Sequence, residues 1–125
     1  MFLQMLFVAF GGAGGALCRY GMTNLINHYV QSHFPFATLA VNAIGSFVMG
    51  VMYVVILERM VLHPDWRSVI IVGFLGAFTT FSTFSLEAVN LLQHGYLGTA
   101  LAYMLLSVLI CITAAWSAMV LTRLL

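Results

Sequence analysis

The near absence of charge over four long apolar stretches restricts what this chain can fold into. Its 125 residues are 63% hydrophobic and only 6% charged, whereas soluble domains carry about 25% charged residues. Segments 3–27, 35–57, 68–93 and 98–122 each reach the ~20 apolar residues that a membrane-spanning helix needs. The sequence therefore predicts an all-α membrane protein, in which residues 1–125 form a single four-helix transmembrane domain.

Charges in the short turns between these spans indicate how the chain is oriented. The chain contains no Lys, and Arg59, Arg67 and Arg123 lie at span ends that four crossings bring to one side. Excess Arg marks the cytoplasmic side of a membrane protein. Because Glu58 and Asp65 lie close to these arginines, the bias is mild and permits weakly determined orientation. The four histidines also fall in predicted loops, at spacings that predict no metal site.

The first span contains GGAGGA at 11–16, in which Gly11 and Gly15 form a GxxxG pair. Small residues at this spacing let two membrane helices approach closely. Arg19 follows Gly15 by four residues and lies on the same stripe. A charged side chain inside a span costs at least ~2.5–3.5 kcal/mol at the centre of the helix. Two interpretations remain open for Arg19, either snorkelling or structural pairing on the one hand, or direct contact with a ligand on the other.

Two other spans carry polar residues four apart, a spacing that places them on one face of a helix. These residues are Thr38, Asn42 and Ser46 in the second span, and Tyr103, Ser107 and Cys111 in the fourth. Each stripe alone fits either a polar conduit or hydrogen bonding between packed helices. Several polar stripes in one small bundle favour the conduit.

The third span contains GFLGAFTTFSTFSLE at 73–87, a stretch that is poorly suited to a straight helix. Glycine lowers helix propensity by ~1 kcal/mol, and Ser and Thr side chains compete for backbone hydrogen bonds. We predict a break near 79–82 that divides the span into two half-helices. Non-helical backbone at this depth is tolerated only inside protein or against water, and discontinuous helices of this kind build ion sites.

Aromatic and acidic side chains accompany the predicted break. Phe81 and Phe84 stand three residues apart, and the positive edge of a phenyl ring can approach an anion, although packing in a core is the alternative for such a pair. Glu87 lies on the same helical face as Thr83 and Phe84. A carboxyl group inside a membrane is a functional candidate by default, either ionised at a water-filled vestibule or protonated.

Three classes of membrane protein are considered for this sequence: a multidrug transporter, a non-transporting assembly subunit and an ion channel. The sequence shows no nucleophile–base pair and no nucleotide motif, so we predict neither an enzyme nor a nucleic-acid-binding protein. A small four-helix proton-coupled multidrug transporter would carry a carboxylate in its first helix, where this chain has Arg19 and no acid. A non-transporting assembly subunit would explain the glycine stripe of the first span but not the hydroxyl-rich third span. An ion channel accounts for both features.

Three segments together resemble the Fluc/CrcB fluoride channel family. They are GGAGGALCRY at 11–20, ATLAVNAIGSFVMG at 37–50 and GFLGAFTTFSTFSLE at 73–87. The resemblance implies a passive fluoride-selective channel that exports fluoride from the cytoplasm across a bacterial inner membrane. It also implies an antiparallel, dual-topology homodimer in the lipid bilayer, with two pores per dimer and a structural Na⁺ at the interface.

The resemblance further implies roles for individual residues. The ring edges of Phe81 and Phe84 would face fluoride, and Asn42 would donate a hydrogen bond to the ion. The backbone carbonyls of Gly76 and Thr79 would hold the Na⁺. The remaining residues implied along the fluoride pathway are Thr38, Tyr103 and Ser107 as a polar track, Thr80, Ser82 and Thr83 as neighbouring hydroxyls, and Glu87 and Arg19. Cys111 departs from the family pattern, which often has a hydroxyl at that position.

Overall fold

The computed structural model describes residues 1–59, 63 and 65–125, and its described part is helical throughout apart from short connections. The elements are α1 (Phe2–Tyr29), α2 (Phe36–Met52), η1 (Tyr53–Glu58), η2 (Arg67–Leu75), α3 (Gly76–Phe78), α4 (Phe81–Gln93) and α5 (Leu97–Leu124). Both η segments have π-helical hydrogen bonding, which the sequence analysis did not anticipate. Part of the loop predicted between the second and third spans, at residues 60–62 and 64, lies outside the described residues.

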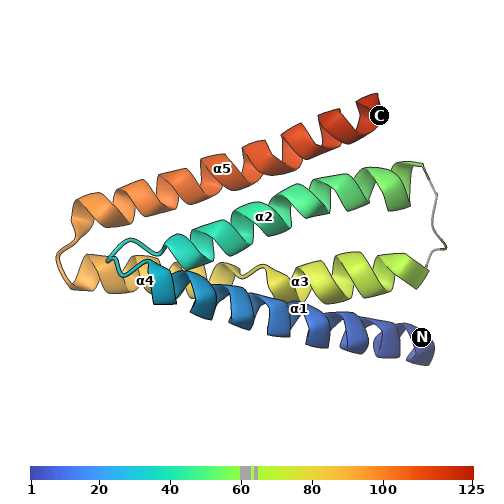
Figure 1. Cartoon of the computed structure of the whole chain (residues 1–125), viewed down its shortest axis with the longest axis horizontal. Helices are drawn as coiled ribbons and strands as arrows, with labels where there is room; N and C mark the ends of the chain where they lie inside the picture. Colours follow the sequence, from blue (N-terminus) through green and yellow to red (C-terminus); the bar gives the residue numbers. More distant parts are fainter. Residues whose placement is uncertain (60–62, 64) are drawn as a thin grey trace.

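Four helices in the described part of the chain are long and apolar enough to cross a membrane. They are Phe2–Tyr29, Phe36–Glu58, Arg67–Gln93 and Leu97–Leu124. This confirms the prediction of an all-α membrane protein with four candidate spans. The helices run up and down, so that both termini and the Arg59 end of the second span lie at one end of the bundle (Figure 1).

Glycines allow the first and third spans to pack closely. A Cβ atom on Gly11 would overlap the carbonyl oxygen of Val69, and one on Gly15 would overlap that of Phe74. Gly73 faces them in turn, and a Cβ there would lie 2.7 Å from the Val8 carbonyl oxygen. Gly11 and Gly15 are the buried residues of α1. The predicted role of this glycine stripe in close helix packing is therefore confirmed.

The second and fourth spans form the other tight pair, with α2 lying between α5 and the third span (Figure 1). At one end, a Cβ on Gly50 would overlap the carbonyl oxygen of Ala115. At the other end, Ala88 and Leu91 of α4 pack with Ala100 and Tyr103 of α5 in a buried apolar cluster. These contacts place the polar stripes of α2 and α5 close to the start of α4.

Two residues of the third span have extended backbone. Helix α3 ends at Phe78, Thr79 has φ −79° and ψ 156°, Thr80 has φ −149° and ψ 116°, and α4 begins at Phe81. The Thr80 side chain accepts a hydrogen bond from the Thr83 N–H at 3.2 Å, which makes it the N-cap of α4. Such a cap satisfies one of the free N–H groups at a helix start.

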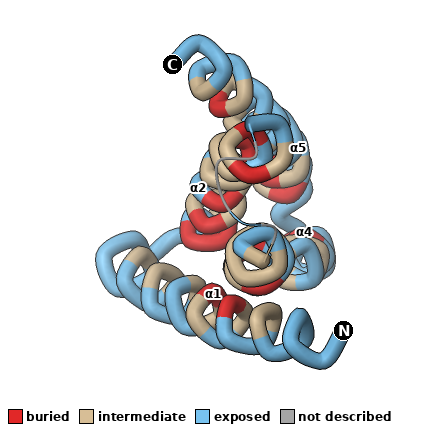
Figure 2. Tube along the Cα trace, turned by 90° about the vertical axis from the view of Figure 1, so that its right-hand side faces the viewer, coloured by how far each residue is buried: buried red, intermediate tan, exposed pale blue. Residues whose placement is uncertain are grey.

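The outer surface of the bundle is largely apolar and exposed. Only 11% of the most hydrophobic window of α1, and the same share for α5, is buried within the chain. Figure 2 shows the buried residues on the sides of the helices that face one another and the exposed residues on the outside. In the absence of water such a surface is compatible with lipid or with a second subunit.

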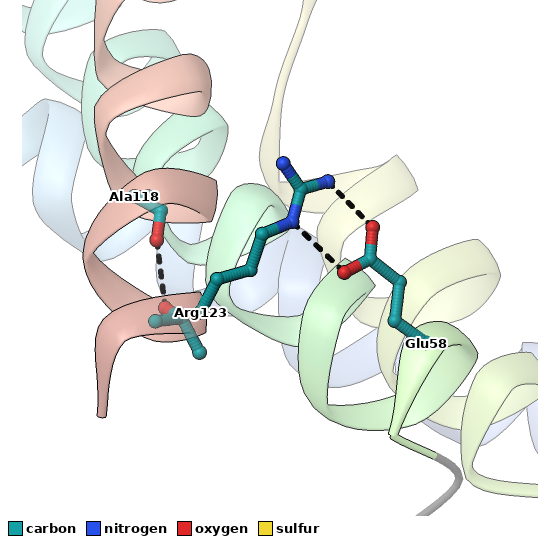
Figure 3. Close-up of polar contacts among 4 residues, drawn as sticks. Glu58, Ala118 and Arg123 are labelled. Atoms are coloured by element: carbon teal, nitrogen blue, oxygen red, sulfur yellow. Dashed lines mark hydrogen bonds and ion pairs between the residues drawn. The ribbon is translucent and has the colours of Figure 1, made fainter.

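Charged residues tie the end of the second span to the end of α5 (Figure 3). The Arg123 guanidinium donates to both carboxylate oxygens of Glu58, from Nε at 2.9 Å and from Nη2 at 2.5 Å. Arg59 donates to the carbonyl oxygens of Thr122 and Arg123 at 2.6 and 3.3 Å. A bidentate pair fixes geometry as well as charge, so these contacts hold α5 against η1 at this end.

Candidate functional site

An open groove of about 400 Å³ lies between α2, the start of α4 and α5. Its walls are mostly apolar, and no charged side chain is among the described residues that line it. Its polar and aromatic lining residues include Asn42, Ser46, Thr80, Phe81, Phe84 and Ser107. Cys111 also lines the groove, together with Ser107 of the same polar stripe of α5.

Asn42 satisfies the backbone where the third span loses its helical hydrogen bonds. Its Nδ2 donates to the Thr80 carbonyl oxygen at 2.9 Å, and its Oδ1 accepts from the Thr80 N–H at 2.7 Å. An amide nitrogen carries two N–H donors, so one N–H of Asn42 remains for another acceptor. Asn42 therefore both holds the interruption and presents a donor at the groove.

The same interruption changes the surroundings of the Gly76 and Thr79 carbonyls. In a continuous helix the Gly76 carbonyl would accept from the Thr80 N–H, which here donates to Asn42. The Thr79 carbonyl would accept from the Thr83 N–H, which here donates to the Thr80 hydroxyl. Both carbonyls therefore lose their usual helical donor. Carbonyl oxygens freed in this way are suitable ligands for a hard cation.

Glu87 is the point at which the polar stripes of α2 and α5 meet. The Thr38 hydroxyl donates to Oε1 at 2.8 Å, and the Tyr103 hydroxyl donates to Oε2 at 2.7 Å. Thr38 and Tyr103 are both buried. Both carboxyl oxygens of Glu87 therefore accept a hydrogen bond from a buried hydroxyl.

Aromatic rings connect the groove to this carboxylate. The centroids of the Phe81 and Phe84 rings lie 5.4 Å apart, and those of Phe84 and Tyr103 lie 5.1 Å apart. Phe81 is 77% exposed, so one side of its ring is free of contacts within the chain. The Ser107 hydroxyl, which also lines the groove, is buried without a hydrogen-bond partner among the described residues.

The remaining predicted site residues are less central in the single chain. Thr83 accepts a hydrogen bond from the Thr80 hydroxyl at 3.0 Å, and the Ser82 hydroxyl lies 3.4 Å from the same oxygen. Arg19 is half-buried on α1, which packs against η2 and α3, and it is not among the residues that line the groove. The structure thus gathers the residues of α2, α4 and α5 but leaves Arg19 apart.

A second pocket, of about 410 Å³, was missed by the sequence analysis. It lies on the far side of Glu87 and includes His33, Asn90, His94 and Tyr96. The sequence placed the histidines in loops, but nothing in their spacing brings His33 and His94 together. They meet because the α1–α2 connection and the α4–α5 turn lie at the same end of the bundle (Figure 1).

These features define a small multi-pass membrane protein with an open groove beside a capped helix start. Residues 6–119 match the sequence profile of a family described as "CrcB-like protein, Camphor Resistance (CrcB)". The chain belongs to this CrcB family.

Proteins that match nearly the whole chain have names that state a function. The protein named fluoride-specific ion channel FluC of Saccharophagus degradans is 52% identical over 118 residues, covering 94% of this chain and 88% of the relative. The FluC of Hahella chejuensis is 47% identical over 97% of this chain and 95% of the relative. That of Magnetococcus marinus is 45% identical over 98% of this chain and 99% of the relative.

Proposed function

We propose that this protein is a passive fluoride-selective channel that exports fluoride from the bacterial cytoplasm across the inner membrane. Its membership in the CrcB family and the name shared by its relatives support this function. The observation that carries the proposal is an uncharged, mostly apolar groove that also has hydroxyl, amide and aromatic groups in its lining. One lining residue, Phe84, packs on Tyr103, which donates to the Glu87 carboxylate. The multidrug transporter considered from the sequence is not favoured, because the relatives are named as channels.

The chemistry of the groove suits a small anion that accepts hydrogen bonds. A selective pore must replace the water around its ion with donors, yet release the ion readily. The second N–H of Asn42 and the Ser107 hydroxyl, neither of which has a partner among the described residues, supply such donors. The edges of Phe81 and Phe84 carry partial positive charge. Without Arg, Lys or His among the described lining residues, no full positive charge traps the ion.

The fluoride path that we propose runs from Asn42 past the two phenylalanines to Ser107, then along Tyr103 and Thr38 to Glu87. Thr80 supports it by capping α4 and by holding the Asn42 side chain. Ser82, Thr83 and Arg19 stay predictions as pathway residues, because their contacts within one chain give them no position along the groove.

We further propose that the working unit is an antiparallel, dual-topology homodimer with two pores. The groove is open along one side, and four helices enclose too little volume to surround an ion path alone. Phe81, exposed at its rim, is suited to packing against a second copy. In this dimer the interruption of the third span becomes a buried break, and the freed carbonyls of Gly76 and Thr79 hold a structural Na⁺ at the interface.

Fluoride efflux from liposomes that contain the purified protein tests the function directly, with an electrode as the detector and a potassium ionophore to remove the membrane potential. We expect Phe84→Ile to lower the flux at least tenfold while the dimer persists, because an aliphatic chain offers no polarised ring edge. Phe10→Ile, at an exposed position on α1, is the matched control and should conduct like the native protein. Absence of flux from folded, inserted native protein would overturn the proposed function.

A further inference from the structure

The second pocket gathers ionisable side chains at the Glu87 end of the proposed path. It is lined by His33 from the α1–α2 connection, Glu87 and Asn90 from α4, and His94 and Tyr96 from the α4–α5 turn. Glu87 connects it to the groove, because the same carboxylate accepts from Tyr103, whose ring packs on Phe84. An ion that leaves the proposed path at Glu87 enters this pocket.

Both histidines are held in defined places by neighbouring groups. The His33 ring stacks on the Tyr96 ring with centroids 4.6 Å apart, and its Nε2 lies 3.4 Å from the Tyr96 hydroxyl oxygen. The His94 Nδ1 lies 2.7 Å from the Asn90 carbonyl oxygen, so this nitrogen carries a proton and donates. In neutral His94 the other ring nitrogen can only accept a hydrogen bond. Protonation turns it into a donor.

The sign of the charge in the pocket depends on these two rings. No Lys or Arg is among the described residues that line the pocket, and Glu87 is its acid. The groups that face Glu87 from α2 and α5 are the Thr38 and Tyr103 hydroxyls. When Glu87 is ionised and both histidines are neutral, the pocket is negative and repels an anion. Protonation of both rings makes it positive. Histidine titrates near pH ~6.5 in water, within the range that cells meet.

Histidines elsewhere in the chain face other groups. His28, at the end of α1, packs edge-to-face on Tyr29 and does not line this pocket. His63 pairs with Asp65 at 3.1 Å, among the segments at the opposite end of the bundle (Figure 1). Of the described histidines, His33 and His94 are therefore the two that line a pocket together with Glu87.

We propose that this pocket is a fluoride-collecting mouth that becomes attractive to the anion when His33 and His94 are protonated, so that conduction rises as the mouth is acidified. The inference rests on the proposed channel function and adds a binding site and its regulation. A cleft lined by one sign of charge raises the local concentration of the opposite ion by about 10-fold to 1000-fold, and the Glu87 carboxylate, which offsets one of the two positive charges, places this pocket at the weak end of that range.

Flux measured at pH 8 and at pH 5.5, with the same pH on both sides of the liposome, tests the regulation. We expect the native protein to conduct about tenfold faster at the lower pH, at the weak end of that electrostatic range. The His33→Gln/His94→Gln double variant should lose the increase, and a native-like melting temperature in detergent shows that it is folded. His28→Gln is the matched control and should retain it. An equal increase in the double variant would overturn the proposal.

A binding measurement separates this proposal from the channel function. Histidine ring signals of the full-length protein in detergent are followed by NMR against pH, in fluoride and in chloride at equal ionic strength. If fluoride binds the protonated pocket, the apparent pKa values of His33 and His94 are higher in fluoride, while that of His28 is unchanged. Identical titrations in both salts would overturn the mouth. Native protein that carries no fluoride at either pH would instead overturn the channel, and the titration would still decide the pocket.

Discussion

At the scale of single residues, Asn42 shows how one side chain can replace regular secondary structure. Its amide pairs with both the N–H and the carbonyl group of Thr80, in the manner of a neighbouring strand residue. In an apolar environment an unpaired backbone group costs several kcal/mol. Asn42 therefore makes the interruption between α3 and α4 tolerable, and its remaining N–H is left at the groove.

Replacement of Asn42 should separate these two contributions. We expect Asn42→Ala to destabilise the protein by about 1–3 kcal/mol, because Thr80 loses both partners. Asn42→Asp keeps the acceptor for the Thr80 N–H but places a negative charge in the groove, and we expect it to obstruct fluoride. Thermal unfolding in detergent and liposome flux measure the two effects.

Ser46→Ala is the matched control for both Asn42 variants. Ser46 lies one turn further along α2 and lines the same groove, and its hydroxyl makes no hydrogen bond within the part of the chain that the structure describes. The control should therefore melt like the native protein. Unchanged flux in Asn42→Asp would remove Asn42 from the ion path.

At the scale of the elements, the first and third spans are held together by backbone contact rather than by large side chains. Gly11, Gly15 and Gly73 let the two helices approach so closely that a Cβ atom at any of these positions would overlap a carbonyl oxygen of the facing helix. Close approach of this kind drives helix association in lipid, where the hydrophobic effect between helices is absent. The position of α4 depends on this contact, because η2 and α3 lead directly into the residues before it.

Substitution of glycines along α1 tests this packing. Gly15→Ala should lower the unfolding free energy by about 1–3 kcal/mol, because its Cβ would collide with the Phe74 backbone and force the helices apart. Gly21→Ala, on the same helix with nothing within 4 Å, is the control. It should be neutral or stabilising by up to ~1 kcal/mol from helix propensity. Equal effects at both positions would contradict the close contact.

Some features of these elements could be predicted from the sequence, and others could not. The lack of charge predicts four spans, and the spacing of Gly11 and Gly15 predicts a packing face, because both signals are local. The partners of Glu87 were not predictable, since Thr38 lies 49 residues away and which helix faces meet is decided by tertiary packing. The π-helical turns of η1 and η2 leave no signature in composition, and the histidine pocket depends on two connections that meet only in the folded bundle.

At the scale of the whole molecule, the distribution of arginines bears on the dual topology that we propose. The three loop arginines lie at one end, but Arg123 is paired with Glu58 and Arg59 is engaged with the carbonyls at the end of α5. Orientation follows the number of Lys and Arg residues near the span ends. A bias of three arginines is small, and a single added charge should therefore shift it.

Labelling at the C-terminus measures the orientation. In a chain with Cys18→Ala, Cys111→Ser and Leu125→Cys, a membrane-impermeant thiol reagent should reach about half of the molecules in intact cells if both orientations occur. Adding Ser32→Arg, at the opposite end of the bundle, should raise the labelled share, because this end would then favour the cytoplasm. Complete labelling or none in the parent chain would exclude dual topology.

Sodium should stabilise the assembled dimer if the Gly76 and Thr79 carbonyls bind it. A ligand at a hundredfold its dissociation constant adds about 2.7 kcal/mol to the stability of the state that binds it. We expect the melting temperature of the dimer in detergent to rise with Na⁺ but not with N-methylglucamine at the same ionic strength. Thr79→Ser keeps the backbone ligand and should keep this response. A dimer that melts identically in both salts would speak against the cation site.

The contacts of Thr80 restrict substitutions at positions 80 and 42 to different degrees. Asn42 contacts only the backbone of Thr80, which every residue type except proline provides in full. The hydroxyl that caps α4 is required separately. Ser could therefore occupy position 80 and keep both the cap and the backbone groups that Asn42 contacts. At position 42, only a side chain with the same amide restores both lost hydrogen bonds. Mutational tolerance should thus be wider at position 80 than at position 42.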